Sequence, residues 1–315
     1  MKRLNLLTAI LLISLAFLPD VNSQTRRRRP IAKPHETTGS RNNVEFNLCE
    51  DFAMQAVASK LTFVTLIPKT IPGRQKILSI KYSTPPERVF SSNGNDYAEF
   101  VFSRPPAQFQ LKINVKATLL KYDLDTARRK QQKNPPVDFD PNDFLKQEKY
   151  IEKDNPRIQQ IAKSIKAPTD MALVQKLYEY VIDNLNYVTH KEEWGAVETL
   201  RRKQGSCTEY SDLFVALCRA AGIPARVVKG YVTESDDSPE HAWAEVYLKD
   251  YGWVPFDLTY GDVEQKSERK KRFSSLKPIY IYLTNTRNDR ILDEAITVAG
   301  YFIGDVQLQS SIEFR

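Results

Sequence analysis

Cysteine is scarce in this chain of 315 residues, which contains only Cys49, Cys207 and Cys218. Three cysteines exclude a disulfide-rich scaffold, because they allow one bridge at most. If Cys207 and Cys218 lie on one helix, they are roughly 16 Å apart, which is far beyond disulfide reach. At least one thiol therefore stays free, even in an oxidising compartment, and a free thiol there suggests a chemical use.

Long apolar runs are also lacking, except at the N-terminus. Residues 1–23 combine a basic start, an apolar stretch over about residues 6–18 and small residues before position 24. This pattern is typical of a secretory signal peptide, since the apolar stretch is too short for a bilayer. An uncleaved anchor is the alternative. We expect an exported protein, periplasmic or extracellular, with no membrane span in the mature chain.

Positive charge is in excess, but not in the part of the chain that we expect to fold. The formal net charge is +7, and residues 24–42 hold six basic side chains against one acidic side chain. This segment lacks apolar periodicity and is predicted to be a disordered basic linker. Residues 43–315 are close to neutral, whereas a nucleic-acid-binding protein keeps its basic residues on a folded face. No nucleic-acid partner is therefore expected.

Two kinds of pattern divide the remaining chain. Residues 43–125 alternate apolar and polar side chains, as in FQLKINVKATLLKYDL, and contain the turn signal SNGN, which predicts a small antiparallel β domain. Charge and proline in residues 126–143 predict a linker. In residues 144–315 helical patterns precede the strand-like runs ARVVKGYV, HAWAEVYL, GWVPFDL, PIYIYLTN and ITVAGYF. This order predicts an α+β domain with an antiparallel sheet.

One predicted helix, over residues 207–221, has clear boundaries. Ser206 and Glu209 have the spacing of a capping box at its start. Apolar residues then recur along a single face. Gly222 ends the helix and Pro224 prevents its continuation.

The two cysteines of this helix have different surroundings. Cys218 lies in the middle of the apolar face and is predicted to be a small buried hydrophobe. Cys207 occupies the first helical position, where free backbone N–H groups and the helix dipole favour an anion. A helix N-terminus lowers the pKa of a thiol and so favours the reactive thiolate, and the same N–H groups can hold an oxyanion. An incidental cysteine is the alternative for Cys207.

A nucleophilic thiol needs a base and a group that orients the base. Of the three histidines, His35 lies in the basic linker, His190 follows a helix and His241 opens the strand HAWAEVYL. A histidine in such an aromatic strand suggests that its ring is used, although a structural role is the alternative. Asp257 ends the apolar run WVPFD, where a carboxylate without a partner would be costly. His241 and Asp257 are therefore the candidate partners of Cys207.

The geometry of the intervening hairpin decides whether these two side chains meet. An even-length turn centred on KDYG would place His241 and Asp257 on opposite faces. A one-residue bulge would make them diagonal neighbours on one face, about 7–8 Å apart at the backbone. We expect the bulge near Pro255, which cannot donate to a ladder. A metal site is the rival use of these residues, but their spacing matches no zinc pattern, so no metal or cofactor is expected.

Two segments, GSCTEYSDLFVALCRAAGIPARVVKGYV and HAWAEVYLKDYGWVPFDLTYGD, resemble the core of the transglutaminase-like superfamily, in its bacterial exported branch. The resemblance covers about residues 165–265, and the β domain before it is similar to N-terminal domains of such proteins more loosely. It implies a papain-like α+β fold, in which a cysteine-bearing helix packs on an antiparallel sheet. It also implies a triad with Cys207 as nucleophile, His241 as general base and acid, and Asp257 as the residue that orients His241.

The resemblance has one departure and leaves one role open. Leu258 stands where the family commonly has proline, which affects a turn and not the chemistry. Family members often recruit an upstream side chain to the oxyanion site, and Trp194 and Tyr187 are the candidates here, with a structural aromatic as the alternative for each. The chain has no dense acidic loop, so calcium activation is not implied.

These features predict an exported cysteine-dependent enzyme that transfers acyl groups from amide bonds of peptides or proteins through a thioester. Hydrolysis, as in a peptidase or amidase, is favoured over cross-linking to an amine, and cell-wall peptides are among the candidate substrates. The alternative is a catalytically silent peptide-binding or assembly module on the same scaffold. The sequence does not indicate an oligomeric state.

Overall fold

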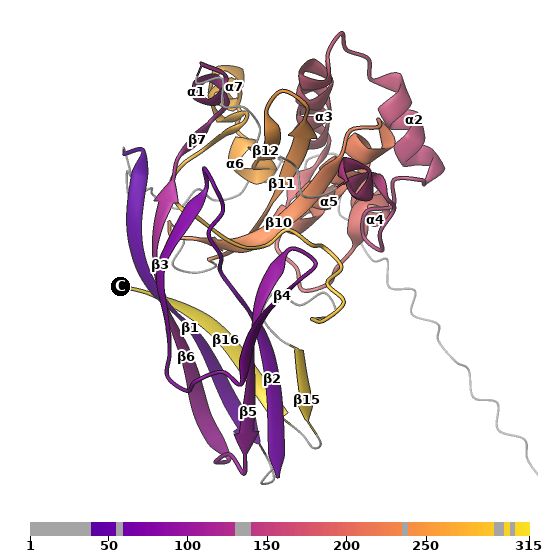
Figure 1. Cartoon of the computed structure of the whole chain (residues 1–315). Helices are drawn as coiled ribbons and strands as arrows, with labels where there is room; N and C mark the ends of the chain where they lie inside the picture. Colours follow the sequence, from indigo (N-terminus) through magenta and orange to yellow (C-terminus); the bar gives the residue numbers. More distant parts are fainter. Residues whose placement is uncertain (1–38, 55–58, 130–139, 235–238, 293–298, 303–305) are drawn as a thin grey trace, which may run out of the picture.

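The structure is a computed structural model, and Figure 1 shows a strand-rich part joined to an α+β part. The α+β fold class expected from the sequence is confirmed. The predicted signal peptide, residues 1–23, lies outside the described residues, as does most of the predicted basic linker. The structure describes residues 39–54, 59–129, 140–234, 239–292, 299–302 and 306–315.

The strand-rich part consists of two four-stranded antiparallel sheets with the orders β16-β1-β6-β3 and β15-β2-β5-β4. Alternate residues of β1, such as Phe46, Leu48 and Phe52, are buried in the core. The ring of Phe52 meets that of Phe63 on β2 at 5.1 Å, so the two sheets pack face to face. The strands are β1 (Arg41–Met54), β2 (Lys60–Ile67), β3 (Gln75–Tyr82), β4 (Arg88–Ser92), β5 (Asn95–Ser103), β6 (Gln108–Leu120), β15 (Ala299–Phe302) and β16 (Val306–Phe314).

The first and the last strands that the structure describes, β1 and β16, both contribute to this part. β1 begins inside the predicted linker 24–42, and the predicted linker 126–143 begins inside α1 (Leu124–Arg129) and ends inside the short 3-10 helix η1 (Pro141–Leu145). The expected catalytic domain, residues 144–315, contains β15 and β16, which pair with β2 and β1. The division into domains itself stays a prediction.

The α+β part is built on an antiparallel sheet with the order β12-β11-β10-β14. Short strands form separate two-stranded sheets, in which β8 runs parallel to β9 and β13 runs antiparallel to β7. Within the described ranges no helix combines the length and the apolarity that a bilayer crossing requires.

In this part the helices α2 to α5 precede the strands β10 to β14, as predicted, whereas α6 and α7 lie between β12 and β13. The helices are α2 (Pro156–Ser164), α3 (Asp170–Asn184), α4 (Gly195–Arg202), α5 (Cys207–Ala220), α6 (Leu258–Gly261) and α7 (Lys266–Arg272). The strands are β7 (Tyr122–Asp123), β8 (Asn186–Tyr187), β9 (Gln204–Gly205), β10 (Ala225–Val232), β11 (Glu240–Leu248), β12 (Gly252–Phe256), β13 (Ser275–Leu276) and β14 (Tyr280–Thr284).

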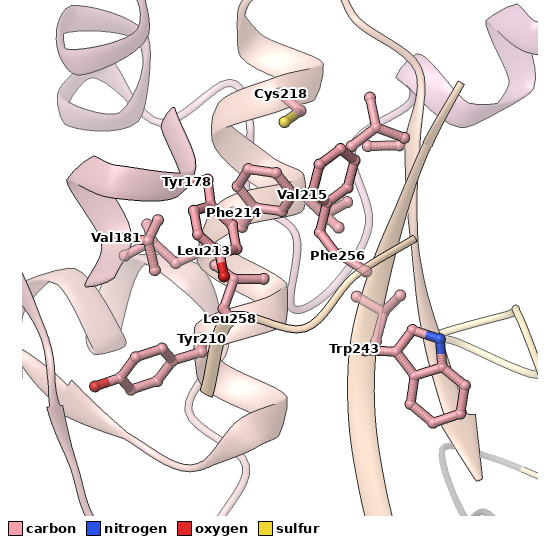
Figure 2. Packing of buried hydrophobic residues seen from close by; sticks show 14 of the residues in the cluster. Tyr178, Val181, Tyr210, Leu213, Phe214, Val215, Cys218, Trp243, Phe256 and Leu258 are labelled. Atoms are coloured by element: carbon pink, nitrogen blue, oxygen red, sulfur yellow. The ribbon is translucent and has the colours of Figure 1, made fainter. Parts of the chain in front are cut away.

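Helix α5 lies at the centre of the α+β part, between the sheet and the other helices. It packs against β10 and β11 and against α2, α3 and α4. Figure 2 shows the rings of Tyr178, Phe214 and Phe256 gathered beside it, with ring centroids 5.8–6.3 Å apart. Cys218 is fully buried in the same cluster, which confirms its predicted role as a core residue. The burial of α5 on several sides holds its N-terminus in a fixed position.

The two parts of the molecule are joined by buried polar contacts as well as by apolar packing. The side-chain amide of Gln75, on β3, both donates to the carbonyl oxygen of Tyr282 and accepts from its N–H, each at 2.9 Å. Arg74 donates to the carbonyl oxygen of Trp253 at 2.6 Å. Ile281 and Leu283 of β14 extend the core of the strand-rich part. Strand β14 therefore belongs to the sheet of the α+β part and also packs into the core of the strand-rich part.

Candidate active site

The first element of the site is the N-terminus of α5, where Cys207 is the first helical residue. Glu209 Oε2 accepts hydrogen bonds from the backbone N–H of Ser206 at 2.9 Å and from its hydroxyl at 2.7 Å. The Ser206 hydroxyl in turn accepts from Thr208 N, so the predicted capping box is confirmed. Cys207 is half-buried and lies where N–H groups without helical partners favour an anion.

The second element is the hairpin of β11 and β12, whose turn has three residues rather than two. Leu248 pairs with Gly252, and Tyr251 N donates to the Leu248 carbonyl oxygen at 2.9 Å. Gly252 follows with a φ of 70°, the left-handed conformation in which a three-residue turn commonly ends. The turn itself therefore supplies the one-residue shift in register.

The expected bulge near Pro255 is wrong in its location. Pro255 lies opposite Glu245 in a regular ladder, because the register has already shifted at the turn. The consequence is still the one anticipated. Continuing the register beyond Phe256 makes His241 and Asp257 diagonal neighbours on one face of the hairpin.

His241 and Asp257 form a buried pair. His241 Nε2 lies 2.6 Å from Asp257 Oδ2, and the two side chains are 1% and 2% exposed. Burial lowers the pKa of His241, but the charge and hydrogen bond of Asp257, together with the hydrogen bond and charge of Cys207, raise it to about 9. The imidazolium form is therefore the stable one at neutral pH.

Cys207, the third candidate residue, lies beside the His241 ring, since it is one of the groups that raise the pKa of His241. A hydrogen bond between the Cys207 and His241 side chains is among the causes of the raised pKa. His241 Nε2 is engaged by Asp257, so Nδ1 is the ring nitrogen available to the sulfur. The order of contacts is Cys207, His241, Asp257, which is the arrangement expected of a nucleophile, a base and an orienting group.

The carboxylate of Asp257 has further partners that sequence reasoning missed. Tyr280, on β14, donates its hydroxyl to Oδ2 at 2.7 Å. Oδ1 accepts from the hydroxyl of Thr259 at 3.1 Å and from Tyr260 N at 2.9 Å, as the N-cap of α6. Tyr178, on α3, donates to the Asp257 carbonyl oxygen at 3.1 Å. A buried tyrosine hydroxyl needs a partner, but no local sequence pattern indicates that Asp257 provides it for these two rings.

Trp194, one of the two oxyanion candidates, lies at the N-cap of α4. Its ring stacks on His190 with centroids 3.6 Å apart and planes at 4°, and the Arg202 guanidinium lies 4.4 Å above the ring. Its indole N–H donates to Glu192 at 3.2 Å. A role at the oxyanion stays a prediction, and it requires the indole to exchange that hydrogen bond.

Tyr187, the other candidate, is placed beside the start of α5 by the parallel pairing of β8 and β9. It lies opposite Gly205, and its ring centroid is 6.5 Å from that of Tyr210. His190, three residues later, brings Nε2 to 3.1 Å from Glu209 Oε2, a contact that sequence reasoning did not anticipate. The segment after β8 therefore borders the N-terminus of α5, while the role of Tyr187 at the oxyanion stays a prediction.

The chemistry available here is that of a thiol, an imidazole and a carboxylate. Among the residues that the structure describes, no three His, Cys, Asp or Glu side chains form a group that would hold a metal ion. Leu258, the departure from the family pattern, is buried and begins α6 directly after Asp257. It therefore belongs to the turn that presents the carboxylate.

Comparison with known proteins relates this arrangement to a family. Residues 159–258 match the family model of the Transglutaminase-like superfamily. The uncharacterised protein YebA of Bacillus subtilis is 32% identical over 111 residues, which are 31% of this chain and 15% of YebA. A protein-glutamine gamma-glutamyltransferase of Pseudomonas aeruginosa is 33% identical over 79 residues, which are 21% of this chain and 12% of that enzyme. The chain thus spans a small fraction of the length of these relatives.

The fold also has a counterpart among solved structures. The crystal structure of a proposed cysteine protease from Cytophaga hutchinsonii matches with a TM-score of 0.58 at 20% identity, covering 87% of this chain and 91% of that one. At this identity the likeness shows the fold alone. Because it covers most of both chains, the match includes the strand-rich part together with the α+β part.

Proposed function

Because residues 159–258 of this chain match the family model of the Transglutaminase-like superfamily, we propose that the protein is an exported cysteine-dependent enzyme that transfers acyl groups from amide bonds of peptides or proteins. The observation that carries this proposal is the buried 2.6 Å contact between His241 and Asp257, with Cys207 hydrogen-bonded to the same imidazole. Export is proposed from residues 1–23 alone, whose pattern is that of a signal peptide.

The proposed reaction begins from an ion pair of the Cys207 thiolate and the His241 imidazolium, which forms when the thiol gives its proton to the imidazole. The thiolate attacks the amide carbonyl carbon, and N–H groups at the start of α5 stabilise the oxygen that becomes negative. The carbon–nitrogen bond then breaks, and the His241 imidazolium gives its proton to the departing amine. The acyl group remains on Cys207 as a thioester.

The second half of the reaction releases the acyl group. His241, now neutral, takes a proton from water as the water oxygen attacks the thioester. The carbon–sulfur bond breaks, which gives a carboxylic acid and restores the thiolate beside the imidazolium. A primary amine in place of water would give a cross-link by the same steps. We propose hydrolysis as the main outcome, with peptides, proteins or cell-wall peptides as substrates.

The activation of Cys207 is tested by its reaction with iodoacetamide at pH 6, with the labelled residue identified by mass spectrometry. We expect fast modification of Cys207 that slows at least about tenfold in His241→Ala, because a thiolate fraction falls tenfold for each unit of pKa. His35→Ala, which changes a histidine of the N-terminal segment, serves as the control and is expected to leave the rate unchanged. Labelling of wild-type protein at the slow rate of an ordinary thiol would contradict the proposal and favour the silent module.

The outcome of the reaction is tested with a mixed peptide library and a primary amine. Backbone cleavage, replacement of a side-chain amide by a carboxylic acid, and amine adducts have different masses and so identify the peptidase, amidase and cross-linking reactions. The matched control is Cys207→Ser, for which we expect none of these products. The same products from wild-type and Cys207→Ser protein would contradict a thioester route.

A further inference from the structure

The carboxylate of Asp257 receives two donors on each of its oxygen atoms. His241 Nε2 and the Tyr280 hydroxyl both lie against Oδ2, at 2.6 and 2.7 Å. Thr259 Oγ1 and Tyr260 N donate to Oδ1. Hydrogen bonds to a carboxylate favour its charged form. Oδ2 differs from Oδ1 because the hydroxyl of Tyr280 and the imidazole of His241, the proposed base, both form hydrogen bonds with it.

Tyr280 is held in this position by packing on several sides. Its side chain lies in the core, and its ring meets that of Trp243 edge-on, with centroids 5.1 Å apart. The His241 ring is 6.0 Å from both of these rings. Trp243 and Tyr280 thus form two walls around the imidazole, and the hydroxyl of Tyr280 is directed at Asp257.

We propose that Tyr280 is a positioning residue of this site, whose hydroxyl fixes Asp257 Oδ2 toward His241 and weakens the hold of that oxygen on the imidazolium proton. The inference rests on the proposed function of Cys207, His241 and Asp257. Through Tyr280, strand β14 helps to determine how tightly His241 holds its proton.

The physical reason is competition for one oxygen atom. The Tyr280 hydroxyl places the positive end of its dipole beside Oδ2, which lowers the electron density available to the N–H of His241. The same positive end lies close to the imidazolium and opposes its charge. Without the hydroxyl, Asp257 would bind the imidazolium proton more tightly. His241 would then release that proton less readily to a departing amine, because an acid works best with a pKa near the operating pH.

The charged groups around His241 act on its pKa in the direction opposite to Tyr280. Asp257 and Cys207 are the groups that change its pKa through charge and hydrogen bonding, and both raise it. Tyr280 acts on one of these two groups and in the opposite direction. The balance among a carboxylate, a thiolate and a hydroxyl therefore determines where the imidazolium loses its proton.

The test is a titration of His241 by NMR in the full chain labelled with ¹³C-histidine. The chain has three histidines, so the resonance of His241 is assigned by substituting His35 and His190 one at a time. In Tyr280→Phe the ring is kept and only the hydroxyl is lost. We expect the pKa of His241 to rise by roughly 0.5–1 unit, the size of effect that a typical intramolecular hydrogen bond produces. An unchanged or lowered pKa would overturn the proposal.

Two further variants distinguish the loss of the Tyr280 hydrogen bond from a general change in packing around His241. Tyr282→Phe removes a hydroxyl from the same face of β14, next to the same Trp243 ring, and we expect the pKa of His241 to stay unchanged. Thr259→Val removes a donor to Oδ1, and we expect a smaller rise than in Tyr280→Phe. An equal rise in Tyr282→Phe would show a packing effect and overturn the specific role of Tyr280. Thr259→Val also keeps the idea testable if Tyr280→Phe does not fold.

The titration is independent of the proposed function, so the two can fail separately. A rise in Tyr280→Phe in a protein whose Cys207 reacts slowly with iodoacetamide at pH 6 would support the role of Tyr280 and contradict the enzyme. Fast reaction of Cys207 with no change in the pKa of His241 would support the enzyme and contradict the role of Tyr280.

Discussion

At the scale of single residues, the buried pair of His241 and Asp257 contributes to stability through its pairing and its hydrogen bonds. Two charges taken out of water are costly unless they are paired and hydrogen-bonded. Here Asp257 has four hydrogen-bond donors on its two oxygens. The pair is therefore a source of stability as well as of chemistry, and it depends on the protonation of His241.

The sign of this dependence follows from the raised pKa of His241. Folding raises it from an ordinary 6.5 to about 9, so the folded protein holds the proton more tightly than the unfolded chain. The contribution is complete below pH 6.5 and is lost as the pH rises through 9. Since one pKa unit corresponds to about 1.4 kcal/mol, we expect Asp257→Asn to reduce the free energy of unfolding by up to about 3 kcal/mol at pH 6 and by less at pH 9.5.

Urea unfolding of wild-type and Asp257→Asn protein at the two pH values measures this difference. The control is Glu198→Gln, since Glu198 pairs with Arg201 and Arg202 at the surface, where ion pairs contribute little. It should change the unfolding free energy slightly and equally at both pH values. A loss for Asp257→Asn that stays constant or grows between pH 6 and pH 9.5 would contradict the charged state assigned to His241.

At the scale of elements, the cap of α5 links the stability of a helix to the setting of Cys207. The Ser206 hydroxyl lies between Thr208 N and Glu209, directly before the cysteine. Helix α3 has a comparable cap, in which Thr169 Oγ1 accepts from Ala172 N at 3.2 Å. The two helices therefore offer a matched pair of caps, of which only one is next to the site.

We expect Ser206→Ala and Thr169→Ala each to lower the free energy of unfolding by about 1 kcal/mol, the usual effect of losing an N-cap. Only Ser206→Ala should also slow the reaction of Cys207 with iodoacetamide, because it loosens the N–H groups beside the sulfur. Urea unfolding and labelling rates measure the two effects. Equal labelling rates in the two variants would mean that the cap of α5 is structural alone.

The same scale shows how much of the site the sequence could predict. The capping box and the extent of α5 were predictable because their signals lie within a few residues of each other. The meeting of His241 and Asp257 was predictable as a possibility, but its cause was not, since the shift depends on the left-handed conformation of Gly252 and not on Pro255. Tyr280 was out of reach, because β14 is separated from β11 along the chain and reaches the site only through β10.

At the scale of the whole molecule, β16, the last strand of the chain, forms an edge of a sheet in the strand-rich part. Half-buried and exposed residues alternate along β16, but Ser310 at one of the inward positions interrupts the apolar pattern, so the sequence does not indicate this strand clearly. Its pairing with β1 joins residues more than 250 positions apart, which local signals cannot indicate. The sequence could therefore predict two kinds of structure in order, but not that β1 and β16 pair in one sheet.

The junction between the two parts depends on Gln75, whose buried side-chain amide forms the kind of hydrogen bonds with β14 that a neighbouring strand would form. Its amide bonds both the N–H and the carbonyl oxygen of Tyr282 and also donates to the carbonyl oxygen of Lys69 at 2.8 Å. Tyr282 lies two residues from Tyr280 on the strand that reaches the site. Gln75 thus ties the strand-rich part to the element that contacts Asp257.

Gln75→Leu keeps the size of the side chain but leaves buried backbone groups of Tyr282 without these partners. Each of these two groups costs about 1–3 kcal/mol, so we expect the free energy of unfolding to fall by about 2–6 kcal/mol. We also expect two unfolding transitions in place of one, since the strand-rich part and the α+β part would no longer unfold together. Calorimetry measures both effects.

The control is Gln110→Leu, which changes an exposed glutamine bonded to Asp51 and should leave a single transition near the wild-type temperature. A single, equally stable transition in Gln75→Leu would show that apolar packing across β14, and not this amide, holds the two parts together.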